Sequence, residues 1–422
     1  MLRVLSIVGT RPEAIKMAPV IKELESHPDG IISRVCVTAQ HREMLDQVFR
    51  LFDVRPDYDL NLMKDAQTPT STAAAVLSGL APIIAVERPD WVLVQGDTTT
   101  TMAAAIAAAY AGAKVGHVEA GLRTYDKYQP FPEEYNRLLA TAVSHLHFAP
   151  TPGARDNLMH ENVAAKDVLV TGNTVIDALH MASRMPFESA AAAQLAHIPR
   201  HKRIVLVTSH RRENHGAPLE SICAALRHIA ARCHDTTHIV FLVHPSPNVR
   251  EPAYRLLSGT PGVSLLPPLD YLPLIHLLKR SYLVLTDSGG LQEEAPSFGL
   301  PVLVMRNTTE RPEGVEAGTC KLVGTDYGTL VNSTMELLDD ASAYHEMAHA
   351  VNPYGDGHAA KRIVAALLRD VAWLPHTYKI ERYGNLIELW VDNPLLAHDL
   401  TTTHKGSVLS NNLTQGAIAA CD

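Results

Sequence analysis

Carboxylates in the first half of the chain stand just after apolar runs, where the strands of an α/β protein present catalytic side chains. Asp97 follows residues 91–94 in QGDTTTT, Glu119 ends the next run in HVEAGLRT, and Glu133 comes a short loop later in PFPEEYNR. Carboxyl groups held in different environments can divide general acid and general base work. Two plainer explanations stay open. Asp97 could cap the alanine-rich helix that follows, and the other acids could be solvated loop residues.

The stretch TDSGGLQEEA, residues 286–295, has the composition of a phosphate-binding turn, although the chain carries neither GxGxxG nor a Walker lysine. Ser288, Gly289 and Gly290 would expose backbone N–H groups at the start of a helix, which suits an anion. Glu294 would lie on that helix and could accept hydrogen bonds from ribose hydroxyls.

Basic side chains follow other predicted strands. Arg11 and Lys16, in GTRPEAIKMAP, could bind a diphosphate, although Arg11 could also be a solvated surface arginine. His210 in TSHRREN could be a general acid, a phosphate ligand or only the cap of a strand. His244 in HPSPNV and Arg311 in NTTERPEG stand at two further strand ends. The whole series of polar strand ends is a stronger signal of a functional site than TDSGG alone.

The elements that must position these residues alternate regularly along the chain. Continuous apolar runs are typical of strands buried on both faces of a parallel sheet. The expected strands are Val4–Val8, Arg34–Thr38, Trp91–Val94, Ala113–His117, His147–Ala149, Ile204–Val207, Ile239–Val243, Leu283–Thr286 and Val302–Met305. Helices are expected between them, as at Pro12–Leu24, Thr98–Ala111 and Leu291–Phe298. The rhythm restarts near residue 203, so we predict α/β architecture with two Rossmann-like domains that face a cleft.

Composition limits the classes of partner. The 422 residues carry a net charge of −8, which does not favour nucleic acid or an anionic membrane surface. No uninterrupted apolar run reaches the ~18 residues of a membrane span, and the N-terminal residues do not resemble a signal peptide. Five scattered cysteines without a CxxC pair indicate thiols in a reducing cytoplasm. No metal-binding motif is present, so we expect neither metal nor cofactor.

Taken in order, eleven motifs resemble those of the non-hydrolysing UDP-N-acetylglucosamine 2-epimerases. They are VGTRPEAIKMAP, AQHREMLDQV, GDTTTT, HVEAGLRT, PFPEEYNR, TGNTVIDAL, TSHRREN, HPSPNV, TDSGGLQEEA, TTERPEG and NPYGDG. The resemblance runs from residue 2 to about residue 370. It implies a fold similar to the glycosyltransferase B type, with domains at 1–172 and 173–357. A helix at about 358–372 would return to the first domain, and the tail at 375–422 has no predicted role.

The resemblance also implies a reaction. Members of the family interconvert UDP-GlcNAc and UDP-ManNAc by eliminating UDP to 2-acetamidoglucal and adding it back, without a cofactor. UDP is then the leaving group, and cations around its diphosphate lower the barrier. A cytoplasmic homodimer that supplies ManNAc for surface polysaccharide is expected. Three alternatives stay open: a 2-epimerase of a UDP-2,3-diacetamido sugar uronate, a glycosyltransferase of the same fold, and a non-catalytic UDP-sugar sensor.

Residue roles carry over by matching motif. Asp97, Glu119 and Glu133 would be the acid/base carboxylates, and His210 a further catalytic or phosphate-contacting group; the base and the acid are not assigned. The expected substrate-binding residues are Arg11, Lys16, Arg137, Ser288, Gly289, Gly290, Glu294 and Arg311.

Many bacterial members are activated by a second molecule of their own substrate. Residues matching or near those regulatory contacts are Gln40, Glu43, Gln67, Arg211 and His244. The chain departs from some members at two places, with Glu43 in place of glutamine and Ala66 in place of arginine. Regulation is therefore a separate expectation from catalysis.

Overall fold

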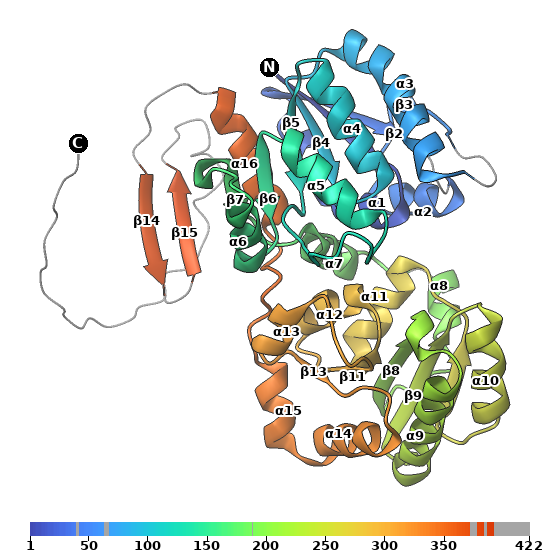
Figure 1. Cartoon of the computed structure of the whole chain (residues 1–422). Coiled ribbons are helices and arrows are strands. Elements are labelled where there is room, and N and C mark those ends of the chain that lie inside the picture. Colours follow the sequence, from blue (N-terminus) through green and yellow to red (C-terminus); the bar gives the residue numbers. More distant parts are fainter. Residues whose placement is uncertain (39–41, 63–66, 188, 372–377, 384–385, 392–422) are drawn as a thin grey trace, which may run out of the picture. The chain divides into compact units, whose positions relative to one another are not determined.

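The computed structural model describes residues 1–38, 42–62, 67–187, 189–371, 378–383 and 386–391. Residues Met1–Leu368 form one compact unit and Arg369–Asp422 a second. The first unit contains two parallel sheets with helices between their strands (Figure 1). The predicted α/β class is therefore confirmed.

The first sheet has seven parallel strands in the order β3-β2-β1-β4-β5-β6-β7. These strands are β1 (Leu2–Val8), β2 (Ile31–Val37), β3 (Tyr58–Asp59), β4 (Trp91–Gln95), β5 (Lys114–Val118), β6 (Leu146–Ala149) and β7 (Val168–Val170). The accompanying helices are α1 (Arg11–Glu25), α2 (Arg42–Phe52), α3 (Pro69–Glu87), α4 (Thr99–Tyr110), α5 (Glu133–Val143), α6 (Pro152–His160), η1 (Ala165–Asp167) and α7 (Thr174–Arg184). Because all strands run the same way, the loops after them open at one edge.

The second sheet has six parallel strands in the order β10-β9-β8-β11-β12-β13. These strands are β8 (Arg203–Ser209), β9 (Thr237–Val243), β10 (Val263–Leu266), β11 (Ser281–Thr286), β12 (Val302–Val304) and β13 (Cys320–Leu322). Its helices are α8 (Ser189–Gln194), η2 (Arg212–Asn214), α9 (Ala217–Cys233), α10 (Pro247–Leu257), α11 (Tyr271–Arg280), α12 (Gly289–Glu294), η3 (Ala295–Phe298), α13 (Pro312–Glu316), α14 (Tyr327–Asp339) and α15 (Ala341–Ala348). The chain then continues into α16 (Ala359–Val371), which packs on the first sheet.

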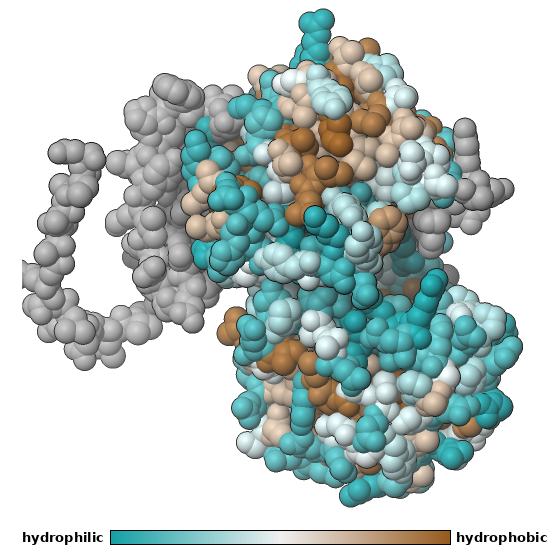
Figure 2. Space-filling view, in the orientation of Figure 1, coloured by the Kyte–Doolittle hydropathy of each residue, from teal (hydrophilic) through white to brown (hydrophobic). Residues whose placement is uncertain are grey.

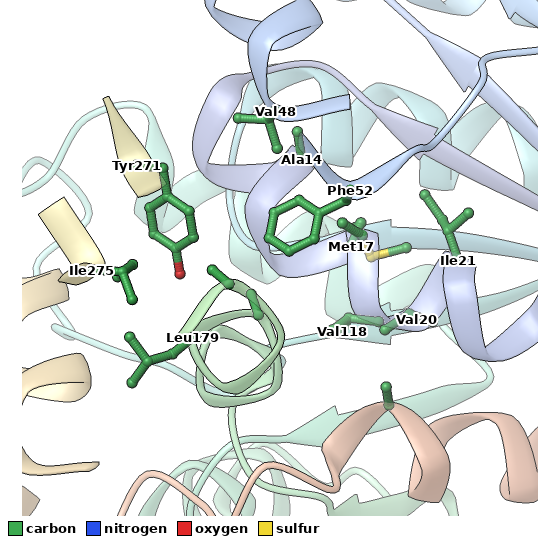
Figure 3. Close-up of a cluster of buried hydrophobic side chains, with 14 of the residues drawn as sticks. Ala14, Met17, Val20, Ile21, Val48, Phe52, Val118, Leu179, Tyr271 and Ile275 are labelled. Atoms are coloured by element: carbon green, nitrogen blue, oxygen red, sulfur yellow. The ribbon is translucent and has the colours of Figure 1, made fainter. Parts of the chain in front are cut away.

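One hydrophobic core is shared by the two sheets. The first sheet packs one face on α3 and α4 and the other on α1, α2, α7 and α16. The second packs one face on α9, α10 and α14, while its other face joins the α1–α7 core through α11. Figure 3 shows this shared core, where Phe52 of α2 and Tyr271 of α11 have ring centroids 6.3 Å apart. The carboxyl ends of both sheets are therefore held together by buried apolar contacts.

Local sequence explains the start of α1, which carries two predicted binding residues. The Glu13 carboxylate accepts hydrogen bonds from the backbone N–H of Gly9 at 2.7 Å and of Thr10 at 2.5 Å. It also accepts the hydroxyls of Thr98 and Thr101 from the start of α4. Glu13 is 3% exposed, and burial raises its pKa. One glutamate thus ties the loops after β1 and β4 into a rigid edge.

The second unit contains an antiparallel pair, β14 (Tyr378–Tyr383) and β15 (Leu386–Val391). Neither strand is among those predicted from the sequence, and the rest of the tail at 375–422, for which no role is predicted, lies outside the described residues.

Candidate active site

A buried ion pair joins α1 to the end of β5. Lys16 Nζ donates to both oxygens of Glu119, at 2.7 and 2.6 Å, and Gln95 of β4 donates to the same carboxylate. Glu119 is 8% exposed and has a left-handed backbone conformation with φ of 62°. Burial raises the pKa of its carboxyl group; Lys16 opposes this shift, and Glu293 adds to it. A carboxyl group that is easily protonated suits proton transfer.

A second buried pair comes from the other sheet. Arg311, just before α13, donates its Nε to Glu293 of α12, and Asn173 donates to the same carboxylate at 3.2 Å. Burial by itself would lower the pKa of Arg311, but Glu293, Glu119 and Glu310 raise it. Because Lys16 also interacts electrostatically with Glu293, the two ion pairs are neighbours. The four charged side chains, which come from the carboxyl ends of both sheets, therefore lie in one site.

Asp97 does not cap the helix that follows it. Thr98 is the N-cap of α4, and its hydroxyl accepts the N–H of Thr101 at 3.1 Å. Asp97 instead accepts a hydrogen bond from the guanidinium of Arg137 on α5. The helix-cap explanation is therefore wrong, and Asp97 and Arg137 lie together as a charged pair at the loop edge.

The adjacent glutamates of PFPEEYNR have different environments. Glu134 is 1% exposed; it accepts the backbone N–H of Tyr125 at 3.1 Å and a guanidinium hydrogen bond from Arg137 at 2.9 Å. Glu133 begins α5, and its Oε2 is enclosed without a hydrogen-bond partner among the described residues. Glu134 therefore holds the loop through its hydrogen bonds, while the Glu133 Oε2 takes no part in holding it.

His210 is held by a buried aspartate of the TDSGG turn. Its Nδ1 lies 2.9 Å from the carboxylate of Asp287, which is fully buried and also accepts the N–H of Arg211 and the amide of Asn214. Burial alone would raise the pKa of Asp287, but these donors bring it down to about 2. The His244 ring lies 6.2 Å from that of His210, and burial lowers the pKa of His244.

The predicted phosphate turn and its glutamate border a small pocket. Ser288 is the N-cap of α12, and its N–H donates to the hydroxyl of Thr286 at 2.9 Å. The pocket, of about 240 Å³, is lined among others by His210, Gly290 and Glu294. Burial, with the neighbouring carboxylate Glu293, raises the pKa of Glu294 to about 8. Among the described residues, these groups form one concave surface at the end of β11.

Arg11 lies beside this pocket and not on the solvated outside of the molecule. It interacts electrostatically with Glu294 and with Tyr271. It also lines, with Val48 and Tyr271, a second hollow of about 680 Å³. Arg11 is thus close to the end of β11 although it belongs to the first sheet.

The predicted regulatory residues are only partly described. Gln40 lies outside the described residues, and Glu43 belongs to α2 with its side chain outside the description. Gln67 donates to the backbone carbonyl of Leu62 at 2.6 Å. Arg211 and His244 lie beside His210, at the ends of β8 and β9.

Sequence reasoning missed the partners that hold the site residues. Glu293, Asp287, Gln95 and Glu310 are all charged or amide side chains close to predicted residues. The signal that could have found them is a second polar residue within or directly beside an already predicted motif. Each of them fixes the direction of a side chain at the candidate site.

The structure and the comparisons place the chain in a class of two-sheet α/β enzymes. The fold alone is shared with a glycosyltransferase of kitacinnamycin, at a TM-score of 0.58 and 14% identity over 86% of this chain and 98% of that one. A sequence profile described as UDP-N-acetylglucosamine 2-epimerase matches residues 22–368.

Relatives of high identity make the assignment specific. The UDP-N-acetylglucosamine 2-epimerase of Escherichia coli strain K12 is 52% identical over 87% of this chain and 98% of its own length. That of Yersinia pestis is 51% identical with the same coverage. The crystal structure of UDP-GlcNAc 2-epimerase from Neisseria meningitidis bound to UDP-GlcNAc has a TM-score of 0.79 and 48% identity, covering 87% of this chain and all of that one. The chain therefore belongs to the UDP-N-acetylglucosamine 2-epimerase family and is an epimerase, an enzyme of the isomerase class. The predicted family, fold class and enzyme class are confirmed.

Proposed function

We propose that the chain interconverts UDP-GlcNAc and UDP-ManNAc at the charged site described above. The observation that carries the proposal is the meeting of two ion pairs, Lys16–Glu119 and Arg311–Glu293, from the carboxyl ends of both sheets. A nucleotide sugar has a dianionic diphosphate next to the carbon that reacts. The cations suit the diphosphate, and the carboxylates suit the sugar.

The reaction that fits these groups is elimination followed by addition. A carboxylate takes the proton from C2 while the bond between C1 and the UDP oxygen breaks, leaving a C1–C2 double bond. UDP then attacks C1 of 2-acetamidoglucal, and a carboxylic acid returns a proton to the opposite face of C2. Asp97, Glu119 and Glu133 are the candidates for these proton transfers, and His210 is the candidate that faces the leaving group. Lys16, Arg137 and Arg311 would stabilise the charge that develops on UDP.

The remaining nucleotide contacts follow from the second sheet and Arg11. Ser288, Gly289 and Gly290 would donate backbone N–H groups to the diphosphate, with Arg11 alongside. Glu294 would accept the ribose hydroxyls. No metal or cofactor has a step in this mechanism, because the leaving group is already activated by its diphosphate.

Proton exchange at C2 tests substrate and mechanism together. The enzyme should be incubated with UDP-GlcNAc alone in heavy water while the anomeric proton signals are followed by NMR. We expect the UDP-ManNAc signal to appear and deuterium to enter C2 of both sugars. Absence of UDP-ManNAc would favour a diacetamido uronate substrate, and product without deuterium at C2 would rule out the elimination.

A second molecule of UDP-GlcNAc is proposed as an allosteric activator that contacts Arg211 and His244. Both residues lie beside the candidate catalytic His210, so an added ligand there could change its surroundings. Supplying UDP-ManNAc alone should then give a lag that a trace of UDP-GlcNAc removes. Conversion of UDP-ManNAc at full rate from the first turnover would contradict activation.

The domain limits are proposed at 1–172 and 173–357, with α16 returning to the first domain. Strands β1 to β7 end at residue 170 and β8 begins at residue 203. Arg362 of α16 donates to the carbonyl of Thr171 at 2.9 Å, which supports the return.

We further propose a cytoplasmic homodimer in polysaccharide precursor supply. Cys36, Cys223, Cys233 and Cys320 are unpaired among the described residues, as a reducing compartment requires; Cys421 is not described. Within the described part of the chain, α3 is long and apolar enough to cross a membrane, judged by length and composition only. The sequence predicted no uninterrupted apolar run of that length. We assign the exposed apolar residues of α3 and α4, among them Val86 and Tyr110, to contact with a second copy. Figure 2 shows hydrophobic residues gathered where Figure 1 places α3 and α4.

A further inference from the structure

The loop between β12 and α13 carries a carboxylate surrounded by three guanidinium groups. Glu310 Oε1 accepts a hydrogen bond from Arg211 Nη2 at 2.6 Å, and Oε2 accepts one from Arg306. Arg311, the next residue, adds a third positive charge nearby. The Glu310 side chain is 28% exposed, so the cluster is open on one side.

This carboxylate lies against the predicted phosphate turn. A Cβ placed on Gly289 would be 3.1 Å from Glu310 Oε1 and 3.9 Å from both Arg211 Nη2 and the Arg311 guanidinium carbon. The missing side chain of Gly289 therefore leaves room for an anion, and in this structure the anion next to it is Glu310. A diphosphate bound by the same turn would need the same arginines at the same distance.

Electrostatic interactions keep the Glu310 carboxylate charged at its place beside the three arginines. Burial by itself would raise its pKa, but Arg211, Arg306 and Arg311 bring it down to about 2. The carboxylate is thus ionised at every pH at which the enzyme could work. Two anions cannot share one set of guanidinium groups without repulsion.

We propose that Glu310 is an internal anion that stands in for the substrate diphosphate, and that the nucleotide must displace it from Arg211 to bind. Glu310 therefore determines nucleotide affinity, and its displacement leaves Arg211 free to hold phosphate oxygens. The inference rests on the proposed function in one respect, which is that the turn at Ser288–Gly290 binds the diphosphate. A different role, in which Glu310 only keeps the arginines in place, predicts the opposite effect of its removal.

Calorimetric titration of the full chain with UDP separates these roles. Glu310→Gln keeps the size of the side chain and removes its charge. We expect it to bind UDP about tenfold more tightly than wild type, the size of one charge-assisted contact. Uridine, which has no phosphate, should bind both proteins equally. Pyrophosphate, which has no nucleoside, should inhibit Glu310→Gln at about tenfold lower concentration.

Glu213→Gln is the matched control, because Glu213 pairs with Arg306 but is not among the atoms nearest to Gly289. It should change UDP affinity less than twofold. Glu310→Ala provides a second variant if the amide lowers the unfolding temperature, and it should also tighten UDP binding. Equal or weaker binding of UDP by both Glu310 variants, with wild type binding normally, would overturn the inference and leave the proposed function standing. Failure of wild type to bind UDP would overturn both.

Discussion

Adjacent residues of the same type have opposite tasks in this site. Glu133 and Glu134 differ in hydrogen bonding, since Glu134 accepts hydrogen bonds from the loop backbone, whereas the Glu133 Oε2 has no partner in the part of the chain that the structure describes. Glu293 and Glu294 repeat the pattern, because Glu293 pairs with Arg311 while Glu294 borders the pocket. Residue type and spacing cannot tell which of two adjacent glutamates has which role. The sequence prediction of Glu133 therefore depended on its motif.

Amide substitution of the two glutamates of α5 should therefore give opposite results. Glu133→Gln should lower kcat by about 10²–10⁴, the range for loss of a general acid or base, with an unchanged unfolding temperature. Glu134→Gln should destabilise the fold by about 1–3 kcal/mol, because the backbone N–H groups of Thr124 and Tyr125 and the Arg137 guanidinium lose a charged acceptor. Steady-state kinetics and thermal unfolding on both variants check this. A Glu134→Gln variant that is stable but inactive would contradict this prediction and indicate that Glu134, rather than Glu133, takes part in the chemistry.

Glu294 links the pH dependence of stability to nucleotide binding. Its pKa is raised from the ordinary 4.5 to about 8 in the folded state, so folding takes up a proton. The stability that this proton provides is fully present below pH 4.5 and is lost as the pH rises through about 8. Glu294→Gln should therefore raise the unfolding temperature relative to wild type at pH 9 much more than at pH 5, while weakening UDP binding.

Glu220→Gln is the control for this pH series, since Glu220 is a half-exposed partner of Arg255. It should leave the difference from wild type the same at pH 5 and pH 9. If Glu294→Gln behaves like this control, Glu294 is ionised in the free enzyme, and the predicted gain in stability is absent.

Among the elements, central strands were predictable and edge strands were not. Each of the nine expected strands corresponds to an observed one, because a strand buried on both faces has a continuous apolar run. The four strands missed in the two sheets are β3, β7, β10 and β13, and these are the four sheet edges. They have two to four residues and partly exposed side chains. Short edges avoid pairing with other chains, and they leave little pattern in a sequence.

The candidate site was predictable to the same degree. The sequence predicted that Asp97, Glu119, His210 and Arg311 lie on loops after central strands, and the structure has them at those places. Which side chains they contact was not, because an ion pair such as Arg311–Glu293 depends on how α12 and the loop after β12 are placed. Distances between separate segments are set by packing, which residue spacing does not encode.

The start of α16 offers a test of how one element is attached. The Asp177 carboxylate of α7 accepts the N–H groups of Ala359 and Ala360, at 3.1 and 2.9 Å, at the first turn of α16. Asp177→Ala leaves these donors without an acceptor and should destabilise the protein by about 1 kcal/mol. Asp356→Ala, which removes a partly exposed pair with Arg362, should cost less than about 0.5 kcal/mol. Denaturant unfolding of both variants measures the difference, and equal losses would exclude the cap.

At the scale of the whole unit Met1–Leu368, function depends on the common core of the two sheets. Helix α7 packs against α1, α11 and α12, so elements that carry Lys16, Tyr271 and Glu293 meet on one helix. The charged site is therefore assembled by apolar packing that the catalytic residues do not themselves provide. Among the described residues of this unit, an apolar surface on α3 and α4 is exposed.

That surface, on α3 and α4, locates the proposed homodimer contact. Val86 of α3 is 72% exposed and Tyr110 of α4 is 87% exposed, beside a groove of about 740 Å³ that residues of both helices line. A contiguous apolar surface of this kind marks a contact with another protein, and a buried carboxylate there would be costly. Val86→Glu and Tyr110→Glu should each convert the dimer to a monomer in light scattering after gel filtration. Tyr254→Glu, at a 41% exposed tyrosine of α10, should leave the dimer intact. If both Val86→Glu and Tyr110→Glu remain dimeric, the contact lies elsewhere, because a buried charge at the centre of a dimer interface would weaken dimerisation.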